Sequence, residues 1–507
     1  MKPTGELITA VVERHARERP AKVFLRHEGQ NVTYADFDRL TNELAHVLLD
    51  MGVQKGDRVT LAMGNSLEYP LAAFAILKAG AVLHPVNPSL GTQELEYLLR
   101  HAEPRLVLTE PSSAAPLLAL RERLPRSTAL ASFGPLPGAT DLEPLRHAAS
   151  SEPSPVALGP DDPSTLLYTS GTTGLPKGVL FHHRSTGAAG KHFLEALGIT
   201  ESDVILAMTP LFHGNAWGGL VTALQAGATF AFPRQFSASQ FWQLVHEVGA
   251  TVLYTLGTIL AILLQQPASA LERTHRLRVI LGLGSAPIRP RIVERFGISH
   301  VAECFGSTDA GVVTIEPLGQ PPRPGSCGLP VPGVAVRIVD EDGRPLPHRQ
   351  VGEIAVRSPH CLAEYFRDPE QTRASLRDGW FFTGDLGYLD EDGWLYFVDR
   401  KRDVIRRGGE NVSSVFVEKV LREHPAVAEV AVVGVPDPVL GQEIKAFVVT
   451  RAPVSAQELE QFAAARLAKF QVPRLWEFRD SLPKTPTQRV EKYKLRAESG
   501  KRGPLLG

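Results

Sequence analysis

The sequence predicts an α/β protein with a large multilobed N-terminal domain of layered sheets, a β-rich subdomain, and a small α+β lid domain at the C-terminal end. Apolar residues at helical spacing over 37–49 and 71–77 alternate with short strand-like runs at 59–63 and 81–85. Such alternation indicates layered α/β structure. The 507 residues also exceed the roughly 250–300 that one core usually serves, so we expect at least two domains.

The later part of the chain changes character twice. An irregular connection rich in Pro, Ala and Ser is expected over 110–163, with one helix near 115–124. After about residue 310, strand-like runs such as 334–340 and 353–357 are separated by turns that contain Gly or Pro. Charges and paired glycines then interrupt the apolar pattern over 399–411. We therefore place an N-terminal domain at 1–399, a hinge at 400–402 and a C-terminal lid at 403–507.

Composition excludes several classes of protein. The 54 Lys and Arg nearly balance the 55 Asp and Glu, so no global charge attracts nucleic acid or anionic lipid. Cys304, Cys327 and Cys361 lack metal-ligand spacing, which supports neither a zinc site nor a disulfide framework. Charges run through 1–19, and the apolar stretch 71–86 is too short to span a bilayer. We expect a cytoplasmic protein without nucleic-acid or membrane partners.

The run from Tyr168 to Val179 is the strongest motif, with three glycines, four Ser or Thr hydroxyls and one lysine in twelve residues. Glycines allow consecutive amides to point at an anion, while hydroxyls and Lys177 add donors and positive charge. Flanking apolar residues predict a strand on each side. The run is not a mononucleotide P-loop, because Pro176 precedes the lysine and no helix follows. A flexible polar surface loop is the alternative, but the ordered arrangement favours a phosphate-binding loop.

This run resembles the signature loop of the adenylate-forming superfamily, which includes acyl-CoA synthetases, luciferases and peptide-synthetase adenylation domains. The resemblance covers roughly residues 5–498, with the motifs in the family's order. It implies an acid–thiol ligase that uses acyl-AMP, or ATP and Mg²⁺, together with CoA and a carboxylic acid. In this loop it assigns nucleotide binding to Thr169, Ser170, Gly171, Thr172, Thr173 and Lys177.

Two further turns, at 282–287 and 304–309, each follow an apolar strand-like run. Ligands of layered α/β proteins bind at such strand ends, although either turn alone would more often be structural. The resemblance places Thr308 at the α-phosphate as a catalytic residue and Asp309 at magnesium. It assigns the adenine pocket to Ser285, Ala286, Pro287, Phe305 and Gly306.

The resemblance continues around the predicted hinge. It implies that Asp385 and Arg400 bind the ribose, that Arg402 is the hinge residue, and that Gly408 and Gly409 let pantetheine pass close to the backbone. In the family, rotation of the lid presents different parts of it for the two half-reactions. The basic cluster in this region could also suggest RNA binding, but it contains an aspartate and no aromatic stacking residue, which favours a solvated face.

An acyl pocket is expected near His213, which occupies the place of a family residue beside the acyl group; a packed core histidine is the alternative. Glycines are frequent in the motifs expected around this pocket, where Trp217 and Tyr254 are the large exceptions. We infer a roomy apolar pocket suited to a bulky or polycyclic acid. The predicted substrate contacts are His213, Trp217, Gly218, Tyr254, Gly282 and Gly284.

Two residues depart from the family's pattern. Arg489 stands at the position of a catalytic lysine, and Asp309 replaces the usual glutamate. A planar guanidinium does not superpose on an ammonium, and losing one charge-assisted contact costs about 1.5–3 kcal/mol. The shorter carboxylate would reach Mg²⁺ through a water. We hypothesise that the protein makes the thioester from acyl-AMP and CoA, with adenylation weak or supplied by a separate enzyme.

Three alternatives stay open on the sequence alone. The first is a complete ATP-dependent carboxylate–CoA ligase, the second an enzyme that passes the acyl group to a carrier protein, and the third a silent acyl-adenylate-binding protein. No Ser-His-Asp arrangement is evident, and His182 and His183 fit a structural role at a strand edge. The pattern is compatible with a homo-oligomer and does not identify the acid.

Overall fold

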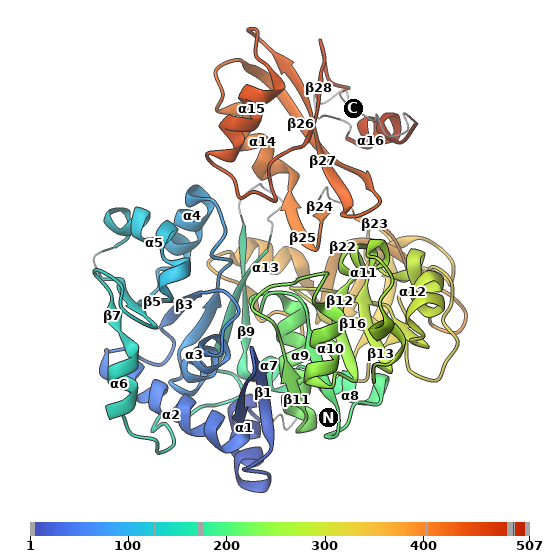
Figure 1. Cartoon of the computed structure of the whole chain (residues 1–507). Helices are drawn as coiled ribbons and strands as arrows, with labels where there is room; N and C mark the ends of the chain where they lie inside the picture. The colour runs from blue at the N-terminus through green and yellow to red at the C-terminus, as the bar shows by residue number, and fades with distance from the viewer. Residues whose placement is uncertain are drawn as a thin grey trace. The chain divides into compact units, whose positions relative to one another are not determined.

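The computed structural model describes residues 6–125, 127–169, 176–400, 404–483, 490 and 492–501 (Figure 1). The chain forms two compact units. The first unit is Met1–Pro88, Leu99–Leu167 and Gly178–Asp399; the second is Ser89–Leu98, Tyr168–Lys177 and Arg400–Gly507. The predicted domain, hinge and lid boundaries stay predictions, and residues 401–403 lie outside the described residues.

An eight-stranded sheet forms one layer of the first unit. From β7 across to β8 its strands are parallel, whereas β9 and β20 are antiparallel to each other. In order across the sheet the strands are β20 (Glu364–Tyr365), β9 (Lys177–His182), β8 (Pro163–Thr169), β4 (Val82–Pro85), β3 (Arg58–Ala62), β5 (Leu106–Thr109), β6 (Ala129–Ser132) and β7 (Thr140–Asp141). The helices of this part of the chain are α2 (Tyr34–Asp50), α3 (Glu68–Lys78), α4 (Thr92–Ala102), α5 (Ala115–Leu120), α6 (Leu142–Ala148) and α7 (His183–Ala188).

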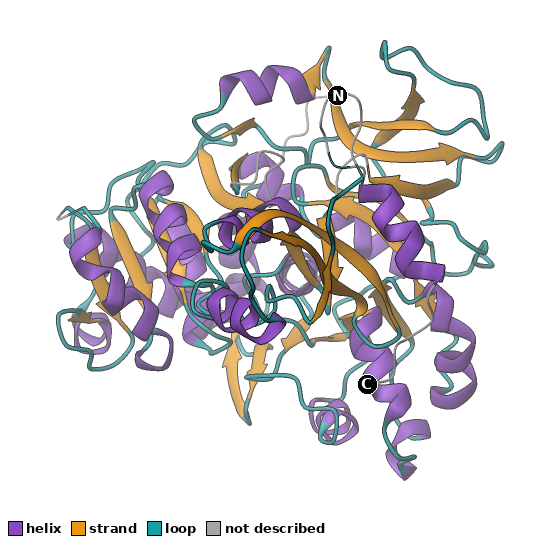
Figure 2. Cartoon of the chain, turned by 90° about the horizontal axis from the view of Figure 1, so that it is seen from above, coloured by secondary structure: helices purple, strands orange, loops and turns teal. Residues whose placement is uncertain are grey.

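A seven-stranded sheet forms a second layer, parallel except for the β1–β2 hairpin. Its strands, in order, are β14 (His300–Ala302), β13 (Val279–Leu283), β12 (Val252–Leu256), β10 (Val204–Ala207), β11 (Thr229–Ala231), β1 (Val23–His27) and β2 (Gln30–Thr33). Its helices are α1 (Ile8–Glu18), α8 (Lys191–Leu197), α9 (Gly214–Ala226), α10 (Phe241–Val248), α11 (Gly257–Gln265) and α12 (Arg289–Phe296). Figure 2 shows helices packed beside the strands of these sheets.

The β-rich subdomain consists of two antiparallel sheets. The smaller contains β15 (Cys304–Ser307), β16 (Gly311–Ile315) and β17 (Leu329–Pro330). The larger contains β18 (Ala335–Val339), β19 (Gly352–Arg357), β22 (Trp380–Leu389), β21 (Leu376–Arg377) and β23 (Leu395–Arg400), with helix α13 (Pro369–Ser375) between β20 and β21 in the chain. The predicted β-rich subdomain is thereby confirmed.

The second unit carries its own sheet and core. Its strands are β24 (Val404–Arg407), β25 (Glu410–Ser413), β26 (Val427–Asp437), β27 (Gly441–Thr450) and β28 (Leu475–Phe478), and its C-terminal helices are α14 (Ser414–Arg422), α15 (Ala456–Ala464) and α16 (Lys492–Lys501). Buried Val417, Val430, Val448 and Leu459 belong to one cluster that joins the sheet to helices α14 and α15. This is the α+β composition that the sequence predicts.

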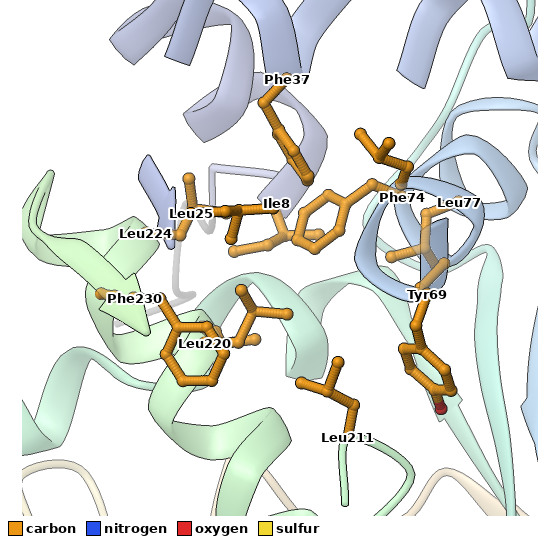
Figure 3. Packing of buried hydrophobic residues seen from close by; sticks show 14 of the residues in the cluster. Ile8, Leu25, Phe37, Tyr69, Phe74, Leu77, Leu211, Leu220, Leu224 and Phe230 are labelled. Carbon is orange, nitrogen blue, oxygen red and sulfur yellow. The ribbon is translucent and has the colours of Figure 1, made fainter. Parts of the chain in front are cut away.

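One hydrophobic cluster serves both layers of the first unit (Figure 3). Phe37 on α2 meets Phe74 on α3 edge to face, with ring centroids 5.2 Å apart. The same cluster contains Leu61 of the eight-stranded sheet and Phe230 of the seven-stranded sheet. Each Å² of apolar surface that is buried stabilises the folded state by about 25 cal/mol. Because the cluster includes residues of both sheets, this burial holds the two sheets and their strand ends against the same helices.

Lys78 lies in the apolar helix α3, where its charge is paired in the interior. The Lys78 side chain is 3% exposed, and its Nζ donates hydrogen bonds to Asp38 (2.5 Å) and Asn42 (2.6 Å) on α2. A buried charge is tolerated when it is paired and hydrogen-bonded. The segment is thus a buried helix followed by strand β4, as predicted, and among the described residues no helix is long and apolar enough to cross a bilayer.

The connection over 110–163 is more regular than the sequence suggests. Helix α5 lies where one helix is expected, but β6 pairs in parallel with β5, and β7 extends the sheet beyond β6. The expectation of an irregular connection is therefore wrong for these strands. Ala129–Ser132 has no β-branched residue, so its strand conformation comes from pairing with β5 rather than from intrinsic propensity.

Buried histidines predict a loss of stability in acid. Burial lowers the pKa of His84 to about 3 and that of His183 to about 4. As the pH falls below about 6.5, these histidines bind protons in the unfolded chain but not in the folded chain. Each such histidine therefore lowers the free energy of unfolding by up to about 1.4 kcal/mol per pH unit. We expect the urea midpoint to fall between pH 7 and pH 5, and to fall less in His84→Gln. An equal fall in the native protein and the variant would contradict this assignment.

Candidate active site

The predicted phosphate loop lies between two strands, as expected, because β8 ends at Thr169 and β9 begins at Lys177. The intervening Ser170, Gly171, Thr172 and Thr173 lie outside the described residues. Their assignment to phosphate binding therefore stays a prediction.

The turn predicted to bind adenine is held by a carboxylate that the sequence reasoning missed. Glu303 is 6% exposed and accepts hydrogen bonds from Gly284 N (3.0 Å), Ser285 Oγ (2.9 Å) and Ala286 N (2.6 Å). Burial raises the pKa of Glu303, and these hydrogen bonds oppose the rise. The side chain of Pro287 lies outside the described residues. Because Glu303 immediately precedes β15, it ties the turn after β13 to the next strand of the site.

A second carboxylate, that of Glu316, belongs to the same hydrogen-bonded network. The backbone N–H of Glu303 donates to Glu316 (2.9 Å), whose carboxylate is paired with Arg289 at 2.5 Å. Arg289 is the first residue of α12, which follows the adenine turn. The two turns predicted to bind the nucleotide are thereby joined through one buried hydrogen-bonded network.

The turn between β15 and β16 carries Thr308 and Asp309. Gly306 cannot be replaced here without movement, because a Cβ would lie 2.5 Å from the carbonyl oxygen of Gly311. Phe305 is 6% exposed and stacks on Phe397, with ring centroids 6.0 Å apart. The β15–β16 pair thus presents Thr308 and Asp309 on a closely packed hairpin.

Asp309, predicted to bind magnesium, has a tyrosine partner. The Tyr365 hydroxyl on β20 donates to Asp309 Oδ1 at 2.7 Å, and Leu362 N donates to the Asp309 carbonyl at 2.7 Å. Within the described part of the chain, no group of three or more His, Cys, Asp or Glu side chains is arranged to hold a metal. A single carboxylate fits Mg²⁺ that is bound mainly by water and substrate phosphates.

The predicted ribose aspartate lies at an irregularity in β22. Between Phe382 and Leu386 the pairing of β22 with β19 shifts register, and Gly384 adopts a φ of 72°. Thr383 Oγ1 donates to the carbonyl of Ile354 at 2.8 Å and accepts from the N–H of Asp385 at 3.1 Å. Bulges of this kind re-aim side chains. Arg400 ends β23, and its side chain lies outside the described residues.

Three of the predicted acyl contacts, His213, Trp217 and Gly218, lie at the start of α9, whereas Tyr254 lies on β12 and Gly282 and Gly284 lie at the end of β13. His213 is the N-cap residue of α9, and half-buried Trp217 packs against Phe74 with ring centroids 5.9 Å apart. A Cβ at Gly218 would meet no atom within 4 Å. Tyr254 is 1% exposed and donates its hydroxyl to Thr222 at 3.2 Å, so its ring belongs to the core behind α9.

Several glycines near this region serve backbone packing. A Cβ at Gly257 would lie 2.3 Å from the carbonyl oxygen of Gly284, and one at Gly219 would lie 3.3 Å from the Tyr254 ring. At Gly282 the nearest atom would be a Leu260 methyl at 3.0 Å. These glycines permit close approach of neighbouring elements, and their number does not measure the width of a pocket.

The paired glycines of the second unit form a tight hairpin turn, which accounts for them without a ligand. Arg407 pairs with Glu410 across the β24–β25 hairpin, which leaves Gly408 (φ 58°) and Gly409 (φ 88°) as a two-residue turn. Such turns require positive φ at both positions. Their proposed proximity to pantetheine stays a prediction, and Arg489 lies outside the described residues.

The network around Glu303 predicts a role in nucleotide affinity. In Glu303→Gln the amide cannot accept all three hydrogen bonds as an anion does, and a hydrogen bond to a charged group contributes about 1.5–3 kcal/mol. We expect the dissociation constant for AMP, measured by calorimetry, to rise about tenfold or more. Glu272→Gln is the matched control, because Glu272 is equally buried (5% exposed side chain) and paired with Arg295 outside these turns. Equal effects in both variants would contradict a specific role.

Comparison with known proteins identifies the family of the chain. The family model for AMP-binding enzymes matches residues 12–366, and the model for the AMP-binding enzyme C-terminal domain matches residues 417–489. The chain is 34% identical to a fatty acid–[acyl-carrier-protein] ligase, ScoC, of Streptomyces coeruleorubidus, over 97% of this chain and 96% of that protein. It is 32% identical to a crotonobetaine/carnitine–CoA ligase of Salmonella paratyphi C, over 94% and 96% respectively.

A solved structure shows the same fold over nearly the whole length. The o-succinylbenzoate CoA synthetase MenE of Bacillus subtilis, a double mutant bound to a product analogue, aligns with a TM-score of 0.85 at 29% identity. The alignment covers 97% of this chain and 98% of that one. The chain belongs to the AMP-binding enzyme family, and it is an acid–thiol ligase of the acyl-CoA synthetase type.

Proposed function

We propose that this protein forms an acyl-CoA thioester from an acyl-adenylate and CoA with release of AMP, and that its own adenylation step is weak. The observation that carries the proposal is Arg489, which stands where the resemblance places the catalytic lysine. In the family that lysine bridges the substrate carboxylate and the phosphate during adenylation. A longer, forked guanidinium does not reproduce a point charge in a close-fitting site. A separate enzyme would then supply the adenylate.

In the reaction scheme that the resemblance implies, the thioester step needs neither that lysine nor the metal. The CoA sulfur bonds to the acyl carbonyl carbon as the carbon–oxygen bond to phosphate breaks; AMP leaves, and the thiol proton goes to solvent. The anhydride is already activated, so catalysis consists mainly of positioning and of stabilising phosphate charge. We assign Thr308 to the α-phosphate, and Asp385 and Arg400 to the ribose. His213 and Trp217 would contact the acyl group.

The metal side of the site concerns the adenylation step alone. Magnesium held beside Asp309 would neutralise charge on the phosphates of ATP, and acyl-AMP carries only one phosphate. Since Tyr365 already occupies one Asp309 oxygen at 2.7 Å, the aspartate is oriented by this hydrogen bond. The phenol thus positions the carboxylate for a metal that matters when ATP is bound.

Removing this hydrogen bond should weaken the binding of MgATP and leave the binding of AMP unchanged. In Tyr365→Phe we expect the dissociation constant of MgATP to rise about tenfold, because a hydrogen bond to a charged group contributes about 1.5–3 kcal/mol, while that of AMP stays unchanged. Calorimetry with both nucleotides measures the difference. Tyr396→Phe is the control, since Tyr396 also donates to a carboxylate, Asp390. A parallel loss of AMP affinity in Tyr365→Phe would contradict a metal-linked role.

Restoring the lysine tests the proposed function directly. We expect the native protein to convert a supplied acyl-AMP and CoA to thioester far faster than it converts free acid, ATP and CoA. In Arg489→Lys the rate from free acid should rise roughly ten- to a hundredfold, which corresponds to about 1.5–3 kcal/mol, with little change in the rate from acyl-AMP. Arg466→Lys, in the same unit, is the matched control. Brisk turnover of free acid by the native protein would refute the proposal.

The ScoC relative favours one second candidate. Because that protein is named as a ligase for an acyl carrier protein, the acyl acceptor of this chain could be the phosphopantetheine of a carrier protein instead of CoA. Both acceptors present the same thiol arm. Comparing transfer from one acyl-AMP to CoA and to a holo-carrier protein at equal concentrations separates the two.

A further inference from the structure

We propose that one face of the larger antiparallel sheet in the β-rich subdomain is a docking surface for an acidic helix of a partner protein. We call this surface the basic face, and its residues are Arg337, Arg357, Arg377, Trp380 and Phe382. The proposal goes beyond the proposed function, because none of these residues is assigned to the nucleotide, the acyl group or the metal.

The basic face is the side of the sheet that points away from the buried cluster. Val356 on β19 and Phe381 on β22 are paired across the strands and belong to that cluster. Successive side chains of a strand point to opposite faces, so Arg357 and Trp380 share the other face. Arg377 on β21 joins them, because it is paired with Trp380.

Ala355 continues the basic face one row further along the sheet. It lies two residues before Arg357 on β19 and is paired with Arg337 on β18 and with Phe382 on β22. Its single methyl group occupies little space between these larger side chains. The guanidinium of Arg337 can therefore extend across β19 and reach the ring of Trp380.

All three guanidiniums lie over aromatic rings of β22. The guanidinium carbons of Arg337 and Arg357 are 4.1 Å and 4.8 Å from the centre of the Trp380 ring, and that of Arg377 is 3.6 Å from the centre of the Phe382 ring. Such stacking is favourable, and it holds long side chains in place at the surface. Less side-chain entropy is then lost when these side chains bind a partner.

The three arginines lack carboxylate partners in the described part of the chain. Arg323 in the same subdomain is a contrast, because it stacks on Trp394 and is also paired with Asp390 and Asp392 at 2.7 Å each. Two guanidiniums that share one indole ring repel each other when no anion lies between them. An anionic partner would relieve this repulsion.

The acidic residues nearest in register do not neutralise the basic face. Glu353 lies on the same side of β19 and accepts a hydrogen bond from the N–H of Gly384 at 2.9 Å. Asp378, in the turn between β21 and β22, is exposed. Among the described residues neither is paired with an arginine of the basic face, which therefore keeps an excess of positive charge.

The spacing of the arginines matches an acidic helix. Arg357 and Arg377 are exposed and lie two strands apart, which separates their backbones by about 9–10 Å. Carboxylates at positions i and i+7 of a helix lie about 10.5 Å apart along one side of it. A planar guanidinium binds a carboxylate through two parallel hydrogen bonds. Chemistry and spacing thus agree.

Two further features favour a protein over a nucleic acid. Proteins that bind single strands stack bases on aromatic rings, whereas the rings of Trp380 and Phe382 are already stacked with guanidiniums. An open hollow of about 410 Å³ also adjoins the basic face and offers room for one side chain of the partner. It is lined by Gly333, Val334, Ala335, Arg357, Ser358 and Pro359.

A labelled helical peptide tests the docking surface on the full-length protein. The peptide carries Glu at i, i+3, i+4 and i+7, and a second peptide of the same composition spreads these residues around the helix. We expect fluorescence anisotropy at low ionic strength to show tighter binding of the first peptide. In Arg357→Glu/Arg377→Glu its dissociation constant should rise about tenfold or more, because like charges then face each other. Arg357→Lys/Arg377→Lys should show a smaller rise, because the charge remains but the fork is lost.

Arg276→Glu/Arg291→Glu is the matched control, since both arginines are exposed in the same unit, lie outside the basic face and undergo the same change of charge. Its affinity for the peptide should equal that of the native protein. Equal losses in the two double variants, no preference between the peptides, or tighter binding of single-stranded RNA or of phosphatidylserine vesicles would overturn the proposal. Because no acyl-adenylate or CoA is present, the outcome is independent of the proposed function.

Discussion

The hydrogen bonds of the Glu303 carboxylate are the constraint on which the rest of the site depends. They fix the turn after β13, while the backbone of the same residue is fixed by Glu316 and Arg289. An anion that accepts several N–H and O–H donors in a dry setting forms stronger hydrogen bonds than it could in water. The two loops that are predicted to bind the nucleotide are thus tied to each other by one hydrogen-bonded network.

Backbone contacts through glycine also hold these loops in place. The carbonyl of Gly284 lies against Gly257 at the start of α11, and that of Gly311 lies against Gly306 inside the β15–β16 hairpin. Any side chain at Gly257 or Gly306 would separate elements that now touch.

Much of the fold follows from local patterns, and the parts that were missed depend on distant contacts. The apolar run at 81–85 contains β4, and the turn predicted at 282–287 lies at the end of β13, whereas residues 304–307 of the second predicted turn form strand β15 and only 308–309 lie in the turn. By contrast, Glu303 and Tyr365 could not be identified, because neither belongs to a recognised motif and their partners are known only once the strands are assembled. The Tyr365 hydroxyl reaches a carboxylate 56 positions away. The glycine count stays a prediction of pocket width, because a Cβ at Gly214, Gly218 or Gly284 would meet no atom within 4 Å while Gly257 is packed against backbone, and the sequence does not distinguish the two kinds.

The second unit offers a physical reason why the change at position 489 is not compensated nearby. Lys492, three residues later, pairs with Glu418 at 2.6 Å and donates to Ser414 at 2.8 Å. Glu418 also accepts from the backbone N–H of Val432. Withdrawing Lys492 would leave this buried carboxylate with Arg422, at 3.0 Å, as its remaining cationic partner, and the lost charge-assisted contact would cost about 1.5–3 kcal/mol, as much as a new contact of that kind would return. This lysine is therefore committed to the fold, and it does not stand in for the lysine that the family resemblance places at position 489, as our proposal of weak adenylation requires.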